Sequence, residues 1–240
     1  AFMIGEQHNL LPVPLMLSEH PGMMILGRAL CGKSATLAAI GEAVMARFSA
    51  DEAQITIVDP KTGPLRDLQG ADYINAYAYD QDEIDEVLTT LAQQVLLPRL
   101  PAKGLSQEEL RALKPWVGPR HFVLVDDAQD LRPAQNHPAK APVGAALWKL
   151  MERGRQIGLH VFATRNSSNF GQLEMDPWVK TQRAAKVPTL FMDNDPQNKV
   201  NRMVRAQALP PGRGLLVNDS EVEGVLVGVP SSMIHNFEQQ

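Results

Sequence analysis

The sequence predicts an α/β fold with a mostly parallel central sheet flanked by helices. Three observations support this class. Short apolar runs alternate along the chain with segments in which apolar residues recur every three to four positions. Several of the runs are apolar throughout, as is typical of strands that helices cover on both faces. Each of these runs ends in a glycine or a polar residue, at the edge where parallel sheets bind ligands.

The first strand and the first helix flank a glycine-rich turn. Residues 23–26 form a short apolar run that stops at Gly27, as expected for a buried strand. The helix expected at 34–48 carries apolar residues at helical spacing from Leu37 to Val44. The chain is therefore expected to enter and leave this turn through regular structure.

The rest of the chain continues the alternation. Further buried strands are expected at 55–58, 122–125 and 160–163. Further helices are expected at 84–97 and 145–157, and a closing hairpin at 215–217 and 225–227. Proline and glycine mark two irregular surface segments, at 100–118 and 132–142.

Length and composition bound the class of protein. The 240 residues are enough for one large domain, and 44% apolar with 21% charged residues is ordinary for a soluble globular protein. No apolar run approaches the ~20 residues that span a bilayer. The net charge of −4 argues against a domain whose main task is to grip DNA. Because the chain begins at Ala1 and opens directly into core-like sequence, we expect residues 1–240 to be a single domain cut from a longer protein.

One segment matches the phosphate-binding pattern G-x-x-x-x-G-K-[ST] in full. It consists of Gly27, Arg28, Ala29, Leu30, Cys31, Gly32, Lys33 and Ser34. The glycines let the backbone direct N–H groups at phosphate oxygens, and the following helix points its positive end at them. Lys33 supplies a charge to the β and γ phosphates, and the Ser34 hydroxyl can coordinate Mg²⁺. We therefore expect residues 27–34 and the adjoining Ala35 to bind ATP with Mg²⁺.

Two alternatives stay open within this segment. The first is a glycine turn that merely carries an exposed lysine, which the expected strand and helix on either side argue against. The second concerns Cys31, the only cysteine, so that an intrachain disulfide is excluded. It is either a small filler or a thiol whose pKa the helix N-terminus lowers, in which case alkylation would block nucleotide binding.

A second acidic motif follows the strand expected at 122–125. Four apolar residues followed by Asp126 and Asp127 describe a Walker B strand. Asp126 would hold Mg²⁺ through water, and Asp127 stands where many such ATPases carry a glutamate that polarises the attacking water. Aspartate is shorter by one methylene, about 1.5 Å, and a misplacement of that order costs up to ~10²-fold in rate. The alternative is a strand that ends in a solvated acidic turn.

Three arginines are further candidates. Arg165 follows Thr164 at the end of the fourth buried strand, where it would either sense the γ-phosphate or face water. Arg153 and Arg155 lie on the third expected helix. Either would reach the nucleotide of a neighbouring subunit as an arginine finger, unless both are ordinary surface arginines.

Two further segments carry a family resemblance. Residues 58–61, Val-Asp-Pro-Lys, look like the I-D-P-K strand end of the FtsK/SpoIIIE branch of P-loop motor ATPases, and residues 154–161 look like its G-R-x-x-G-I-H-L segment. The resemblance implies a RecA/FtsK-like P-loop NTPase fold. That branch usually has glutamate in place of Asp127 and glutamine in place of Arg165, so the resemblance also implies weak ATP hydrolysis.

Within this branch the chain most resembles EccC, the type VII (ESX) secretion ATPase of mycobacteria and their relatives. Residues 111–119 look like its approach to Walker B, residues 125–127 match its V-D-D, and residues 209–214 resemble its P-P-G-R-G segment. Residues 164–169 stand where the family commonly has R-R-S-G-G-A. The likeness extends from residue 12 to about residue 230 and is closest to the C-terminal, third ATPase domain of EccC.

The resemblance implies partners as well as a reaction. EccC carries three ATPase domains behind a membrane anchor, which implies a cytoplasmic domain of an inner-membrane complex, in contact with other ATPase domains of its chain and with membrane components. It also implies low ATP turnover, a hexameric assembly and recruitment of small helical WXG-motif substrates through their C-terminal signal. Nucleic acid is not expected as a partner. The alternatives are an FtsK/SpoIIIE-like DNA-translocating domain and an active stand-alone ATPase.

An amphipathic signal helix would need an apolar groove. The candidates to line one, which are more often simple core residues, are Leu147, Leu150, Met151 and the region 192–204. Trp116 and Trp178 lie in loop-like sequence contexts. They mark either an interface or packing against the parent domain.

Overall fold

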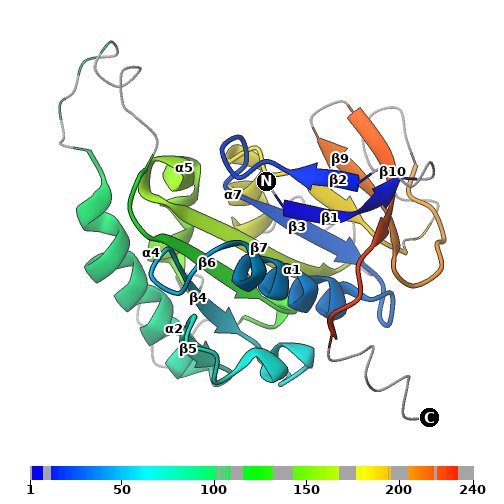
Figure 1. Ribbon diagram of the computed structural model, residues 1–240, viewed down its shortest axis with the longest axis horizontal. Helices are drawn as coiled ribbons and strands as arrows, with labels where there is room; N and C mark the ends of the chain where they lie inside the picture. Colours follow the sequence, from blue (N-terminus) through cyan, green and yellow to red (C-terminus); the bar gives the residue numbers. More distant parts are fainter. Residues whose placement is uncertain are drawn as a thin grey trace.

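The computed structural model of the chain describes residues 2–7, 12–101, 104, 106, 108, 116–131, 143–167, 177–193, 195, 205–218 and 221–231. In this part of the chain, ten strands form one sheet in the order β2-β1-β10-β9-β8-β3-β7-β6-β4-β5, with helices packed on its faces (Figure 1). The predicted α/β class is therefore confirmed. None of the helices described is long and apolar enough to cross a membrane.

Six strands make up the parallel part of the sheet. In spatial order they are β8 (Thr189–Phe191), β3 (Gly22–Gly27), β7 (Leu159–Asn166), β6 (Arg120–Val125), β4 (Ala53–Val58) and β5 (Ile74–Ala78). The four strands predicted from apolar runs are β3, β4, β6 and β7, and all are confirmed. Because β7 lies between β3 and β6, its carboxyl end lies between the turn after Gly27 and the acidic pair after Val125.

Four antiparallel strands extend the sheet beyond β8. They are β9 (Arg213–Asn218), β10 (Glu221–Val227), β1 (Phe2–Gln7) and β2 (Pro12–Leu15). The hairpin of β9 and β10 confirms the predicted closing hairpin. The sequence pattern does not predict β1 and β2, and β2 contains Pro12 and Pro14, which is tolerated because it lies at the edge of the sheet.

Successive residues of β3 point to opposite faces of the sheet, so both faces are covered. Met23 and Ile25 belong to the core cluster on the side of α1 (Lys33–Arg47) and η1 (Pro64–Leu68). Met24 and Leu26 belong to the cluster on the other side. That side carries α2 (Gln81–Thr90), the π-helical turn η2 (Leu91–Leu96), η3 (Leu97–Arg99) and α7 (Pro177–Ala184). This two-sided burial is why the central strands are apolar throughout.

The helix predicted at 145–157 is wrong in its continuity. The segment forms three short pieces, α4 (Ala145–Trp148), η5 (Met151–Arg153) and α5 (Gly154–Ile157). A side chain at position 154 would meet the carbonyl oxygen of Leu159 at 2.6 Å, so the chain folds back this closely onto β7 only at a glycine.

The groove interpretation is also wrong for the three apolar residues of this segment. Leu147, Leu150 and Met151 are buried and belong to the core cluster that α2 covers. They are therefore core residues, as the alternative held. Of the second groove candidate, Met192 is buried and Asp193 is described, whereas residues 194 and 196–204 lie outside the described residues.

Candidate functional site

The turn between β3 and α1 has the backbone shape that phosphate binding requires. Gly32 has a φ of 100°, in the left-handed region that favours glycine. A side chain on Gly27 would come within 2.5 Å of the Cys31 sulfur, so only glycine fits there. Lys33 opens α1, is 7% exposed, and donates a hydrogen bond from Nζ to the Arg28 carbonyl at 2.8 Å. The lysine ammonium therefore lies over the turn.

Arg28 fastens this turn to the end of β8. Its side chain makes two hydrogen bonds to Asp193, Nε to Oδ2 at 2.9 Å and Nη2 to Oδ1 at 2.8 Å. The Arg28 backbone N–H also donates to the Asp193 carbonyl at 2.8 Å. The Arg28 guanidinium holds the pKa of Asp193 below its usual range, so the pair is ionised at neutral pH. Asp193 gives no local signal in the sequence, and sequence analysis missed it.

The closing hairpin reaches the same turn from the other side. The Gly212 N–H donates to the Cys31 carbonyl at 3.2 Å, and the Val227 N–H donates to the Gly212 carbonyl at 2.8 Å. Gly212 belongs to the segment 209–214, whose resemblance to a family motif gives no indication of this contact. The antiparallel part of the sheet is therefore bonded directly to the turn.

The hypothesis of a reactive Cys31 is wrong. Its side chain is buried at 2% exposure within the core cluster under α1. Burial raises the pKa of the thiol more than the nearby Lys33 lowers it. The thiol is therefore protonated at neutral pH and shielded, which leaves the alternative that Cys31 is a small filler.

The acidic motif after β6 meets the turn through side-chain hydroxyls. Asp126 is 3% exposed and accepts hydrogen bonds from the hydroxyls of Thr164 and Ser34. Burial raises the pKa of Asp126, and these two hydrogen bonds counteract the rise. Ser34 and Asp126, the two residues predicted to hold Mg²⁺, are thus brought together.

Both carboxylate oxygens of Asp127 accept a hydrogen bond from a side chain of the chain itself. Its Oδ2 accepts a hydrogen bond from Lys61 Nζ at 2.8 Å, and its Oδ1 accepts one from Gln129 Nε2 at 2.8 Å. Its backbone has a φ of 46°, and its N–H donates to Thr164 Oγ1 at 2.8 Å. Burial would raise the pKa of Asp127, but the hydrogen bonds from Lys61 and Gln129 outweigh it and hold the pKa below its usual range. Lys61 also pairs with Asp130 at 2.7 Å.

The predicted arginines lie at opposite edges of the sheet. Arg165 is half-buried near the carboxyl end of β7, in register with Leu26, one residue before the turn 27–34 (the phosphate turn below, after its sequence pattern) begins. Arg155 is exposed on α5, which precedes β7, and its Nη1 donates to the Ser18 carbonyl at 3.4 Å. Arg165 therefore lies beside the turn of its own chain, whereas Arg155 and the exposed Arg153 do not.

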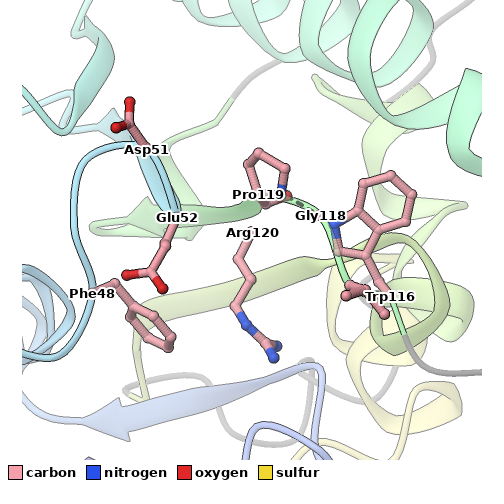
Figure 2. A pocket seen from close by; sticks show the side chains of 8 residues that line it. Phe48, Asp51, Glu52, Trp116, Gly118, Pro119 and Arg120 are labelled. Carbon is pink, nitrogen blue, oxygen red and sulfur yellow. Dashed lines mark hydrogen bonds between the residues drawn. The ribbon is translucent and has the colours of Figure 1, made fainter.

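A cavity of about 610 Å³ opens at the amino ends of β4 and β6, the edge opposite the turn. It is lined by Phe48, Asp51, Glu52, Trp116, Val117, Gly118, Pro119 and Arg120 (Figure 2). Trp116 is held by a hydrogen bond from Nε1 to the Pro119 carbonyl at 2.9 Å and by the Arg99 guanidinium, 4.7 Å from its ring centre. Trp178 does not line an interface: it is buried against Trp148, ring edge to face.

No family model matches the chain, but individual proteins do. It is 34% identical to the ESX-5 secretion system protein EccC5 of Mycobacterium marinum over 242 residues, which cover 95% of this chain and 17% of that protein. The chain thus spans about a sixth of the length of this relative.

Solved structures share the fold. A chain described as an ATPase is 30% identical with a TM-score of 0.81, and the match covers 95% of this chain and 87% of that one. EccC of Thermomonospora curvata (ATPases 2 and 3), solved in complex with a signal sequence peptide, gives a TM-score of 0.82 at 24% identity, over 95% of this chain and 40% of that one. At this identity, the similarity to the Thermomonospora curvata structure supports a shared fold and nothing more.

Proposed function

Because the chain belongs to the EccC-type secretion ATPases, we propose that it is an ATP-binding domain of a type VII secretion motor, with slow hydrolysis of its own. In this proposal ATP and Mg²⁺ bind between the turn 27–34 and Asp126. Binding stabilises the domain and its contacts with neighbouring ATPase domains. The placement as the third ATPase domain of such a protein is part of the proposal.

The main support for ATP binding is that Lys33, Ser34 and Asp126 lie together at the same turn. The Lys33 ammonium lies over a turn of left-handed glycine geometry, where it would bind the β and γ phosphates. The Ser34 hydroxyl and the Asp126 carboxylate are joined, and hydroxyl and carboxylate oxygens are the ligands that Mg²⁺ prefers. When bound, Mg²⁺ neutralises charge on the phosphates. The donor set therefore suits the metal and the nucleotide.

The state of Asp127 supports the proposal of slow hydrolysis. A carboxylate that orients an attacking water must have an acceptor lone pair directed at that water. Both oxygens of Asp127 already accept hydrogen bonds, one of them from the Lys61 ammonium. The side chain is also one methylene shorter than the glutamate common in related ATPases. Both features oppose efficient hydrolysis.

For the substrate, we propose the C-terminal signal of small helical WXG-motif proteins. An amphipathic peptide needs an apolar surface with polar groups at its rim. The cavity at the amino ends of β4 and β6 offers the rings of Phe48 and Trp116 beside the charges of Glu52 and Arg120 (Figure 2). The cavity lies at the amino end of β6 and Asp126 at its carboxyl end, about 20 Å apart. A peptide in the cavity and a nucleotide at Asp126 therefore need not compete.

The test of ATP binding is a thermal unfolding scan with and without Mg-ATP. At a concentration 100 times the Kd, binding adds about 2.7 kcal/mol, which raises the Tm of a domain of this size by roughly 5 to 10 °C. Lys33→Ala is expected to abolish the shift, whereas Lys149→Ala, at an exposed lysine, keeps it. Equal shifts in wild type and Lys33→Ala would exclude this turn as the binding site.

A further inference from the structure

Asp59, directly after β4, is a buried carboxylate with one oxygen unsatisfied. Its exposed fraction is 0%, and no hydrogen-bond donor in the described part of the chain reaches its Oδ1. The other oxygen, Oδ2, accepts a hydrogen bond from the Tyr77 hydroxyl at 2.9 Å. Leaving a buried acceptor unsatisfied costs free energy, so Oδ1 needs a donor that the described residues do not supply.

The unsatisfied oxygen faces the same small space as the carboxylate of Asp126. Strands β4 and β6 are parallel neighbours with Val58 opposite Val125, so the two aspartates follow at adjoining strand ends. A side chain on Gly63 would begin 3.8 Å from Asp59 Oδ1 and 3.7 Å from Asp126 Oδ2. The absence of a side chain at Gly63 therefore leaves room in front of both oxygens.

Two carboxylates facing one space repel each other unless a cation lies near. A divalent cation would offset this repulsion. Asp127 is less suited to contribute, because Lys61 and Gln129 occupy its two oxygens.

We propose that Asp59 is the second acidic residue of the Mg²⁺–nucleotide site and that its Oδ1 accepts a hydrogen bond from a water molecule bound to Mg²⁺. This inference rests on the proposed binding of ATP at residues 27–34. Tyr77 is a positioning residue, since it holds Oδ2 and leaves Oδ1 directed at the open space. Burial and the Asp59 carboxylate raise the pKa of Tyr77, so its hydroxyl stays protonated and donates.

The test measures metal affinity without relying on hydrolysis. Calorimetry gives the affinity of the full chain for ATP in EDTA, and a Mg²⁺ titration at fixed ATP gives the affinity for the metal. Asp59→Asn is expected to weaken Mg²⁺ binding by about 10- to 100-fold while ATP binding in EDTA stays unchanged. Tyr77→Phe is expected to weaken Mg²⁺ binding less. Asp67→Asn, an exposed aspartate of η1, is the matched control and keeps wild-type affinity.

A second variant tests the same space from the opposite side. Gly63→Ala would place a methyl group in ordinary contact with both carboxylates, so it is expected to fold and to displace the water. Unchanged Mg²⁺ affinity in Asp59→Asn overturns the proposal, as does an equal loss of ATP binding in EDTA, which would make Asp59 merely structural. If Asp59→Asn does not fold, wild-type affinity in Gly63→Ala overturns it instead. If the wild type does not bind ATP at all, the proposed function itself is refuted. This outcome differs from failure of the Asp59 proposal, in which the wild type binds ATP and the variants keep its Mg²⁺ affinity.

Discussion

The Nζ atom of Lys61 lies 2.8 Å from Oδ2 of Asp127. The lysine side chain is 58% exposed and the aspartate side chain 18% exposed, so the pair lies at the rim of the site. It connects the turn after β4 to the end of β6. The carboxylate predicted to polarise water is thus bound by a cation of its own chain.

Lys61→Met is expected to raise the rate of ATP hydrolysis. Removing the ammonium frees Oδ2 of Asp127 to accept a hydrogen bond from water, and a rise of up to tenfold in kcat corresponds to about 1.4 kcal/mol. Stability should change by less than about 1 kcal/mol, because the ion pair is exposed. Phosphate release from Mg-ATP measures the effect. Lys61→Arg keeps a cation in place and is the control, and a rate that does not rise in Lys61→Met contradicts the role given to the pair.

Arg28→Ala and Asp193→Ala are expected to weaken Mg-ATP binding to the same extent. Each removes one half of the contact that fastens the phosphate turn to β8. Since either change breaks the same contact, the double variant should bind no more weakly than the single ones. Calorimetric titration of all three with Mg-ATP measures this. Additive losses in the double variant would show that the two residues act separately.

Trp116→Ala is expected to weaken binding of C-terminal peptides of WXG-motif proteins and to leave the Mg-ATP melting shift unchanged. The ring forms one wall of the cavity at the amino ends of β4 and β6, and truncating a central aromatic of a binding site typically costs 2 kcal/mol or more, about 30-fold in Kd. Fluorescence anisotropy of labelled peptides, with and without ATP, gives the affinities. Tyr79→Ala removes an aromatic side chain that is exposed elsewhere, and it should bind like wild type.

Acidification from pH 7 to pH 5 is expected to destabilise the fold through two buried histidines. Burial lowers the pKa of His121 to about 4 and that of His160 to about 3. The unfolded chain takes up a proton at each near pH 6.5, while the folded chain does not, so stability falls as pH drops below about 6.5. Each histidine contributes about 2 kcal/mol of this loss at pH 5.

Urea unfolding of wild type and His121→Gln at the two pH values isolates one histidine. Glutamine can keep a hydrogen bond with Thr56, the partner of His121 Nε2 at 2.8 Å. The variant should therefore lose about 2 kcal/mol less than the wild type between pH 7 and pH 5. An identical pH dependence of the two proteins would rule out uptake of a proton by His121 as a cause.

The central strands and the phosphate turn follow from local sequence, whereas the contacts around them do not. Strand β3 is apolar throughout because it is buried on both faces, and that signal is contained in its own residues. The edge strand β5 carries the exposed Asn75 and gives no comparable signal. The helical pattern at 145–157 is real, but the segment is divided into α4, η5 and α5, and its spacing alone does not show the divisions.

The candidate site shows the same division. Lys33, Ser34 and Asp126 belong to patterns that a single segment carries. Asp59 and Tyr77 meet only because β5 pairs with β4, and Lys61 reaches Asp127 only because β4 pairs with β6. Which distant strands pair depends on the whole sheet. The spacing of residues along the sequence therefore could not predict these contacts.

The hydrogen bond from Gly212 to Cys31 joins the antiparallel strands to the turn 27–34, at which we propose that nucleotide binds. Together with the Arg28–Asp193 pair, it attaches the phosphate turn to β8 and β9 at two points. A coupling between two sites acts equally in both directions, so any effect of nucleotide on the position of the hairpin would be matched by an equal effect of a hairpin-binding partner on nucleotide affinity. The antiparallel strands thereby connect the turn 27–34 with the surface of the hairpin.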